Sequence, residues 1–510
     1  MTAVESPNHL GQSGSATAAK RAVVAPLILL GVWVSGVAGL GLIDGLIRVS
    51  HEVRLVVVSV ALFLAGLIFA AILACPLRLR RGLALLRLGP WICVGFGVVF
   101  GLASLVWLAP AEGTRAVTDP AFLVPAALLA LAGLASFALG YAFTPRILKT
   151  VVNRANAGLQ GPVLGSPGPA SVLTLWGISV LAQVGAMLSG SFGYLSDPSA
   201  ALGATSSLPA VLALLADVGL LSTLLAAWWY AGERNGGALA LLVYVVLTQV
   251  ALGLFAGLKE SVIIQFVAVF LGYGVRRRVR FLPILIAASL VVVVIVPLIT
   301  QYRLSVLVGS GRLSPAQVLE TITVDDLAAS TSDTSMTESM EQFGQRLSRV
   351  GDVAVIMQKT PEVVPYQSPV DLAAGPVLGL IPRSLWAGKP VLDAGYRMSS
   401  VYYGLPPGVF TSNAMTPYGD LWRHGGPWVV ALGMAILGML VRAIDERNGD
   451  PRTDPRLLFL PMLLFAPLVK QEMDYLGLWA SLVGVVVVAT ISARMVATMS
   501  RPATRLRYSG

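Results

Sequence analysis

Residues 209–230, PAVLALLADVGLLSTLLAAWWY, and residues 238–258, ALALLVYVVLTQVALGLFAGL, are two apolar runs separated by a short polar segment. Each run has the length of an α-helix that crosses the hydrocarbon core of a bilayer, about 20 residues. The first run contains one charged residue, Asp217, and the second contains none. Because lipid offers no hydrogen-bond partners, only a helix satisfies the backbone of such an isolated run. The two runs therefore predict a pair of transmembrane helices.

Comparable runs recur along the whole chain. Of its 510 residues 56% are apolar and 12% are charged, whereas soluble domains carry about 25% charged residues. This composition excludes a water-soluble globular protein. We predict an all-α polytopic membrane protein with about twelve transmembrane helices, of which the eighth and eleventh are short. The predicted spans are Val23–Leu42, Leu55–Cys75, Gly89–Leu108, Ala121–Phe143, Ser171–Leu188, Pro209–Tyr230, Ala238–Leu258, Ser261–Val275, Phe281–Ile299, Trp428–Val441, Leu457–Val469 and Tyr475–Ile491.

The distribution of charge predicts the orientation. With the N-terminus inside, the inner segments hold 22 of the 36 Lys and Arg residues but only 6 of the 26 Asp and Glu residues. The positive-inside rule then places both termini in the cytoplasm, and the protein in the cytoplasmic (inner) membrane. Clusters such as Arg78–Arg81 and Arg276–Arg280 mark the ends of spans and lack an aromatic stacking platform, so we expect no nucleic-acid partner.

The spans divide the chain into five parts. We predict a disordered cytoplasmic tail at 1–22, a bundle of nine spans at 23–299, a long outer-face loop at 300–426, three more spans at 427–492, and a basic cytoplasmic tail at 493–510. Loops of such length are usually functional or independently folded. We therefore expect the function to reside in the long loop.

The loop contains helical patterns. From Met340 to Met357 apolar residues recur at helical spacing, which predicts an amphipathic helix that ends before Pro361. We expect its apolar face to pack on the bundle, with a membrane-surface position as the alternative. Further along, Thr416-Pro417 has the pattern of a helix cap followed by a first-turn proline, and Gly425-Gly426 ends that short helix before the tenth span.

Three loop and turn segments carry charged residues that are candidates for binding or catalysis. Arg383 and Lys389 flank Trp386 in a Pro- and Gly-rich turn that would hold a phosphate, although interfacial anchoring explains the same residues. Asp420 and His424 share one helical face, so they are candidates for a general base and its orienting partner, with a surface ion pair or cap as the alternative. Lys259 lies at a helix turn near the membrane boundary, where function, snorkelling or pairing with Glu260 all remain open.

No segment has the pattern of a metal site. The chain contains 2 Cys and 3 His, and these residues lack the spacing of zinc ligands. Both cysteines, Cys75 and Cys93, lie in apolar runs, which argues against a disulfide framework. We predict no metal and no other cofactor.

Over roughly Leu254–Ile444 the chain resembles the O-antigen polymerase and oligosaccharide repeat-unit polymerase family of bacterial membrane proteins. The motifs that carry the resemblance are Gly257-Leu-Lys259, Ile381-Pro-Arg-Ser-Leu-Trp-Ala-Gly-Lys-Pro390, Arg397 followed after ten residues by Gly408, and Thr416-Pro-Tyr-Gly-Asp-Leu-Trp-Arg-His-Gly-Gly426. The family commonly has arginine where this chain has Lys259, and lysine lacks the bidentate geometry of arginine.

The resemblance implies polymerisation of polyprenyl-diphosphate-linked oligosaccharide repeat units into a surface polysaccharide at the outer face of the membrane. A flippase and a chain-length regulator would be its protein partners. Asp420 and His424 would then accept the proton of the attacking sugar hydroxyl. The residues expected to hold diphosphate or glycan are Lys259, Arg349, Arg383, Lys389, Arg397 and Arg423.

Two other classes fit parts of the sequence. A different lipid-linked glycan transferase or ligase would use the same donor with another acceptor, and its carboxylate could be Asp44 or Glu52 in the first outer loop. A secondary transporter would suit about twelve spans with both ends inside, but the two halves of the chain look dissimilar.

Overall fold

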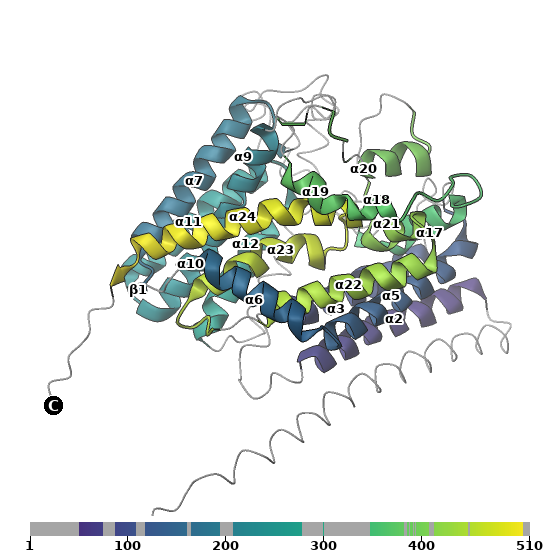
Figure 1. Ribbon diagram of the computed structural model, residues 1–510, viewed down its shortest axis with the longest axis horizontal. Helices are drawn as coiled ribbons and strands as arrows, with labels where there is room; N and C mark the ends of the chain where they lie inside the picture. Colours follow the sequence, from purple (N-terminus) through teal and green to yellow (C-terminus); the bar gives the residue numbers. More distant parts are fainter. Residues whose placement is uncertain are drawn as a thin grey trace, which may run out of the picture.

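The computed structural model describes residues 50–74, 87–108, 118–160, 165–193, 208–277, 299, 347–381, 385–386, 388–390, 392, 394–406, 413–446 and 449–502. Within these residues the chain is helical apart from one two-residue pairing of β1 (Gly165–Ser166) with β2 (Arg501–Pro502). The predicted all-α fold is confirmed for this part of the chain (Figure 1).

The helices of the first half are α2 (His51–Ala74), α3 (Leu88–Phe96), η3 (Gly97–Gly101), η4 (Leu102–Leu108), η5 (Pro120–Phe122), α5 (Leu123–Ala142), α6 (Arg146–Gln160), α7 (Pro169–Leu188), α9 (Leu208–Ala216), α10 (Val218–Glu233), α11 (Gly236–Phe255) and α12 (Lys259–Arg276). Those of the second half are α17 (Val350–Lys359), α18 (Val370–Ala373), α19 (Gly375–Leu380), α20 (Ala394–Arg397), η7 (Met398–Tyr402), α21 (Pro417–Arg423), α22 (Pro427–Asp445), η8 (Pro455–Leu458), α23 (Phe459–Val469) and α24 (Tyr475–Met499).

Eight helical segments among the described residues are long and apolar enough to cross a membrane. They are Glu52–Ala74, Leu88–Leu108, Pro120–Ala142, Pro169–Leu188, Leu208–Glu233, Gly236–Phe255, Pro427–Asp445 and Tyr475–Met499. Much of the surface of these helices stays exposed to the surroundings. Such exposed apolar helices are those of a multi-pass membrane protein, whose outer surface contacts lipid instead of water.

The remaining predicted spans differ from these eight. The first predicted span lies outside the described residues, as does the ninth except for Ile299. The eighth and eleventh correspond to α12, which carries charges at both ends, and to the short helix α23. Helix α24 continues to Met499, beyond the predicted end of the span at Ile491 and into the predicted C-terminal tail.

The sixth predicted span is interrupted. It consists of α9 and α10, with Asp217 at the break between them. The Ser179 hydroxyl of α7 donates a hydrogen bond of 2.7 Å to the Ala216 carbonyl, which lies at the end of α9. A hydroxyl from a neighbouring helix therefore satisfies a backbone group that the break leaves without an intrahelical partner.

Helices α5 and α22 pack closely along their length (Figure 1). Glycines make this approach possible, because a Cβ at Gly140 would lie 2.0 Å from the Ala435 carbonyl oxygen. A Cβ at Gly438 would lie 2.0 Å from the carbonyl oxygen of Phe137. Small residues at such contacts are typical of helix association in membranes, where close backbone packing replaces the hydrophobic effect.

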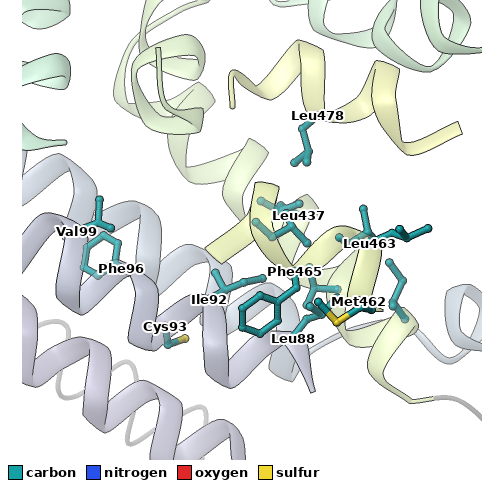
Figure 2. Close-up of a cluster of buried hydrophobic side chains, with 14 of the residues drawn as sticks. Leu88, Ile92, Cys93, Phe96, Val99, Leu437, Met462, Leu463, Phe465 and Leu478 are labelled. Carbon is teal, nitrogen blue, oxygen red and sulfur yellow. The ribbon is translucent and has the colours of Figure 1, made fainter. Parts of the chain in front are cut away.

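Large apolar side chains fill the centre of the bundle. Figure 2 shows Leu88 and Ile92 of α3 near Leu437 of α22 and Phe465 of α23, with Phe96 further along α3. All five side chains are buried. This core holds α3, α22 and α23 in fixed relative positions, and thereby fixes where the ends of these helices present their charged residues.

Parts of the predicted outer loop pack on the bundle. Residues 300–346 lie outside the described residues, and so does the beginning of the predicted helix Met340–Met357. Its observed part, α17, ends at Lys359 before Pro361, as predicted, and contacts α5 and α21. Ser348 and Arg349 lie inside the predicted helix but are not helical, so the prediction of one continuous helix is wrong at these residues. Helix α19 lies along α24, since a Cβ on Gly379 would lie 2.1 Å from the Ala480 carbonyl oxygen.

Candidate functional site

A charged linker, Lys470–Asp474, joins α23 to α24 and meets three other elements. Lys470 pairs with Glu260 at the start of α12. Glu472 pairs with Arg349 just before α17. The backbone amide of Leu476, after the linker, donates a hydrogen bond of 3.0 Å to Asp420 of α21.

We call these interacting side chains the linker cluster. Its members are Glu260, Arg349, Asp352, Tyr403, Asp420, Arg423, His424, Lys470, Glu472 and Asp474. Helices α17 and α21, which carry Asp352, Asp420 and Arg423, lie on the right of Figure 1. The cluster contains two groups of interacting charges, one around Arg349 and one around Asp420, and the linker with the first turn of α24 joins them. In a chain with 12% charged residues, two such groups beside one short linker are a candidate functional site.

Arg349 is the buried cation at the centre of the linker cluster. Its Nη1 atom lies 3.0 Å from Asp352 Oδ2, and its Nη2 atom pairs with Glu472. The Tyr403 hydroxyl donates a hydrogen bond of 2.6 Å to the other oxygen of Asp352. Burial lowers the pKa of Arg349, but the Asp352 and Glu472 carboxylates outweigh burial and raise this pKa above its ordinary value. The guanidinium is therefore held charged.

The irregular backbone of the third predicted span, which is the observed segment Leu88–Leu108, positions Arg349. Residues 97–101 form the π-helical turn η3, which the 3₁₀-helix η4 follows. The amide of Arg349 donates a hydrogen bond of 3.3 Å to the Val99 carbonyl within this turn. Trp107 Nε1 donates one of 3.0 Å to the Ser348 hydroxyl. π-Helical turns are frequent at functional sites because they expose carbonyls that an α-helix would use internally.

Three side chains of the linker cluster are partly exposed. Lys470 Nζ lies 2.7 Å from Glu472 Oε2 and also pairs with Glu260. The side chains of Lys470, Glu472 and Glu260 are 33%, 37% and 44% exposed. Burial raises the pKa of Glu472, but Arg349 and Lys470 together lower it below its ordinary value. Glu472 is thus an anion between two cations.

Helix α21 supplies buried residues of the linker cluster. The Thr416 side chain accepts a hydrogen bond from the Gly419 amide and caps the helix, as its sequence predicts. Asp420 is fully buried, and its Oδ1 atom accepts a hydrogen bond of 2.7 Å from Arg423 Nε. Both carboxylate oxygens of Asp420 therefore have donors, one from α21 and one from the start of α24.

His424 contacts Asp420 differently from the predicted arrangement. Its Nδ1 atom lies 2.7 Å from the backbone carbonyl oxygen of Asp420 and 3.5 Å from the carboxylate. A carbonyl oxygen only accepts hydrogen bonds, so Nδ1 is the donor in this contact and Nε2 is the nitrogen left to accept a proton. The expected carboxylate–imidazole hydrogen bond is thus replaced by a carbonyl–imidazole one, because the ring reaches the preceding helical turn of its own backbone.

Arg423 has an unused donor. Its side chain is 7% exposed, and its Nη1 atom is buried without a hydrogen-bond partner among the described residues. A buried donor without an acceptor costs about 1–3 kcal/mol. An anionic or hydroxyl-bearing ligand would remove this cost by accepting a hydrogen bond from Nη1.

Asp474 caps α24 through a hydrogen bond of 2.7 Å from the Gly477 amide. Burial, together with the nearby Asp420 carboxylate, raises the pKa of Asp474 from 3.8 to about 6. The folded protein therefore keeps this carboxyl protonated over a range in which the unfolded chain ionises it. By linkage, this group lowers stability as the pH rises from about 4 to about 6.

We expect Asp474→Asn to remove this pH dependence. Asparagine keeps the cap but has no proton to lose. The thermal midpoint of the wild-type protein in detergent should fall relative to that of the variant between pH 4 and pH 7. Parallel midpoint curves for the two proteins would contradict the raised pKa of Asp474.

The other predicted residues lie in several places. Lys259 is the first residue of α12, beside Glu260, but the partner of Glu260 is Lys470. A contact between distant segments, which the sequence did not predict, thus holds Glu260. Lys389 donates a hydrogen bond of 3.0 Å to the Ile381 carbonyl, and Arg397 ends α20. Arg383 lies outside the described residues.

Sequence reasoning missed six members of the linker cluster as functional candidates: Glu260, Asp352, Tyr403, Lys470, Glu472 and Asp474. One signal was available, since the linker places three charged residues at alternate positions between two apolar helices. Gln471 has a left-handed φ of 57°, so the chain turns sharply inside the linker.

Among the described residues no group of three or more His, Cys, Asp or Glu side chains has the arrangement of a metal site.

Comparison with known proteins gives one match. Residues 199–449 match the model of a family described as a domain of unknown function, DUF8712. The match runs from before α9 to just after α22, so it includes α12, α17 and α21 but ends before the charged linker. No curated protein and no solved structure matches the chain. The chain is therefore similar over just under half of its length to a family whose function is not known.

Proposed function

We propose that this protein is a membrane glycosyltransferase that polymerises polyprenyl-diphosphate-linked oligosaccharide repeat units at the outer face of the cytoplasmic membrane. The observation that carries the proposal is the linker cluster. It contains four of the candidate residues proposed from the sequence, Arg349, Asp420, Arg423 and His424, together with the unused buried donor of Arg423. These residues come from segments that the resemblance to the polymerase family covers.

The proposed topology has about twelve spans, both termini in the cytoplasm and the linker cluster at the outer face. The charges at the ends of α12 support it. Glu260 and the linker cluster lie at its N-terminal end, whereas Arg276 Nε at its C-terminal end donates a hydrogen bond of 3.2 Å to the Arg452 carbonyl. Basic residues concentrate at the C-terminal end, which the positive-inside rule assigns to the cytoplasm.

In the proposed reaction a sugar hydroxyl oxygen attacks the anomeric carbon of the donor glycan. The bond from that carbon to the diphosphate oxygen breaks, and the electron pair leaves with the diphosphate. His424 Nε2 accepts the hydroxyl proton, while the Asp420 carbonyl holds Nδ1–H and orients the ring. Arg423 Nη1 stabilises negative charge on the leaving group. Lys259, Arg349, Arg383, Lys389 and Arg397 are the further proposed contacts to diphosphate or glycan.

The direct test is incubation of the purified protein with a polyprenyl-diphosphate-linked repeat unit, with products resolved by mass spectrometry. We expect a ladder spaced by one repeat unit, and we expect EDTA to leave it unchanged because arginine and lysine side chains supply the proposed stabilisation of the diphosphate. Arg383→Ala should abolish the ladder, whereas Arg234→Ala, in an exposed turn between α10 and α11, should preserve it.

Other products would point to other functions. A single transfer to an added acceptor would select a glycan ligase. If several chemically different repeat units are each tried as the substrate and none gives a product, the polymerase proposal is rejected. Loss of the ladder in EDTA would contradict stabilisation by cations alone. An intact ladder with Arg383→Ala would remove that residue from the site.

One observation favours a second candidate, a secondary transporter. The break between α9 and α10 places Asp217 inside a 26-residue apolar segment. Close to the break, Gln183 Nε2 donates hydrogen bonds to Ser179 Oγ at 3.0 Å and Gln249 Oε1 at 3.1 Å. Interrupted helices with polar neighbours bind substrates in transporters. Uptake of lipid-linked or free oligosaccharide into proteoliposomes, without any glycan ladder, would select this candidate.

A further inference from the structure

Helix α6 differs from the spans that surround it. Its sequence, RILKTVVNRANAGLQ, contains three cations and no carboxylate, and α6 is not among the eight candidate spans. Apolar and basic residues nevertheless alternate with helical spacing, so the helix is amphipathic. It follows α5 and contacts α22 and α24.

One side of α6 packs on the bundle. Lys149 Nζ lies 2.6 Å from Glu446 Oε2, and Asn153 Nδ2 donates a hydrogen bond of 3.1 Å to the Glu446 carbonyl. Glu446 also pairs with Arg442. The carboxylate nearest to α6 is therefore already neutralised by two cations from the protein itself.

The opposite side of α6 is exposed. We call it the α6 face, and it consists of Arg146, Ile147, Thr150, Val151 and Arg154. Ile147 is 79% exposed and Val151 is 57% exposed. Two large apolar side chains thus lie between two exposed guanidinium groups, on a helix that carries no negative charge.

A bilayer interface satisfies both kinds of side chain. The apolar residues of an amphipathic helix enter the boundary between headgroups and acyl chains, and flanking arginines reach the lipid phosphates. The α6 face lies at the end of α22 where Arg442 and Glu446 are found, which is the end opposite to the linker cluster. Because the α6 face is purely cationic, its charge complements an anionic headgroup and not a zwitterionic one.

We propose that the α6 face binds the headgroups of anionic phospholipids, in the leaflet at the basic end of the bundle. The interaction does not depend on the reaction at the linker cluster. Lipid binding at the α6 face would hold α5, α22 and α24 at that leaflet, because α6 follows α5 and contacts α22 and α24.

Lipid binding to the full-length purified protein tests the proposal. Native mass spectrometry would measure the binding of dioleoyl phosphatidylglycerol and of dioleoyl phosphatidylcholine, which have the same acyl chains. One cation near an anionic surface contributes about 1 kcal/mol, or about fivefold in affinity. The double variant Arg146→Gln/Arg154→Gln should therefore weaken phosphatidylglycerol binding about 25-fold and leave phosphatidylcholine binding unchanged.

Two controls separate the α6 face from general effects of charge. Arg234→Gln removes an exposed arginine from the turn after α10 and should keep the preference for phosphatidylglycerol. Raising NaCl from about 50 mM to about 500 mM should weaken that preference in the wild-type protein, because salt screens exposed charges. This second measurement applies even if the double variant fails to fold.

Three results would overturn the proposal. They are an unchanged lipid preference in the folded double variant, an equal loss in Arg234→Gln, and a preference that is insensitive to salt. Glycerol 3-phosphate is the soluble headgroup analogue. Full competition by glycerol 3-phosphate would also overturn the proposal, because it would indicate a pocket for free phosphate and not a lipid-binding surface.

Discussion

Arg349→Ala is expected to lower the free energy of unfolding by about 3 kcal/mol, because it leaves two carboxylates without their shared cation. Removing one partner of a buried ion pair typically costs about 3–5 kcal/mol, and we expect the lower end because Glu472 is partly exposed. The Tyr403–Asp352 hydrogen bond of 2.6 Å would remain, but it donates to a buried anion with no cation beside it. Thermal or denaturant unfolding in detergent measures the loss.

A second substitution identifies the cause. If uncompensated charge is responsible, then adding Glu472→Gln to Arg349→Ala should restore part of the lost stability. The two changes should thus be non-additive in a double-mutant cycle. Additive losses would mean that Arg349 acts through packing alone. Arg456→Ala breaks another buried guanidinium–carboxylate pair, with Asp454, and is the matched single variant away from the linker cluster.

Asp420→Asn is expected to reduce turnover of the lipid-linked repeat unit by about 100-fold or more. A general base typically accelerates a reaction by at least about 100-fold, and Asp420 positions the proposed base His424. The carboxylate accepts hydrogen bonds from Arg423 Nε and from the Leu476 amide. Asparagine retains one acceptor of similar shape but loses the negative charge beside Arg423. The position of Arg423 Nη1 and the electrostatic support of His424 should both change.

The matched control for this substitution is Asp454→Asn. Asp454 forms a bidentate pair with Arg456, at 2.8 Å and 2.9 Å, close to the start of α23. This variant should lose stability but keep its turnover, because the pair lies away from the linker cluster. A purely structural role of Asp420 predicts that both variants lose stability and activity to a similar extent. Wild-type turnover by a folded Asp420→Asn protein would exclude Asp420 from the reaction.

Local sequence signals predicted the elements that carry the site. The Thr416-Pro417 pattern predicted the start of α21, and Pro361 predicted the end of α17. Both signals act within a few residues, since a cap or a proline changes the hydrogen bonding of the adjacent turn. The positions of Asp420, Arg423 and His424 on one short helix were therefore predictable.

The partners of these residues were not predictable. Glu472 is 123 positions from Arg349, and Lys470 is 210 positions from Glu260. An ion pair between distant segments leaves no periodic pattern in one sequence. The sequence could indicate only local partners, such as Asp420 for His424 and, as one alternative, Glu260 for Lys259. Packing of α23 and α24 against the bundle places Lys470 beside Glu260 and Glu472 beside Arg349.

The sequence by itself determined that this chain is a helical membrane protein, because hydropathy over about 20 residues is a local property that selects lipid as the solvent. It also determined most helix positions in the described part of the chain. Only the tertiary structure decided that the linker Lys470–Asp474 and the first turn of α24 lie beside α12, α21 and the start of α17. The physical reason is that a buried charge takes the partner that packing places beside it, whatever their separation along the chain.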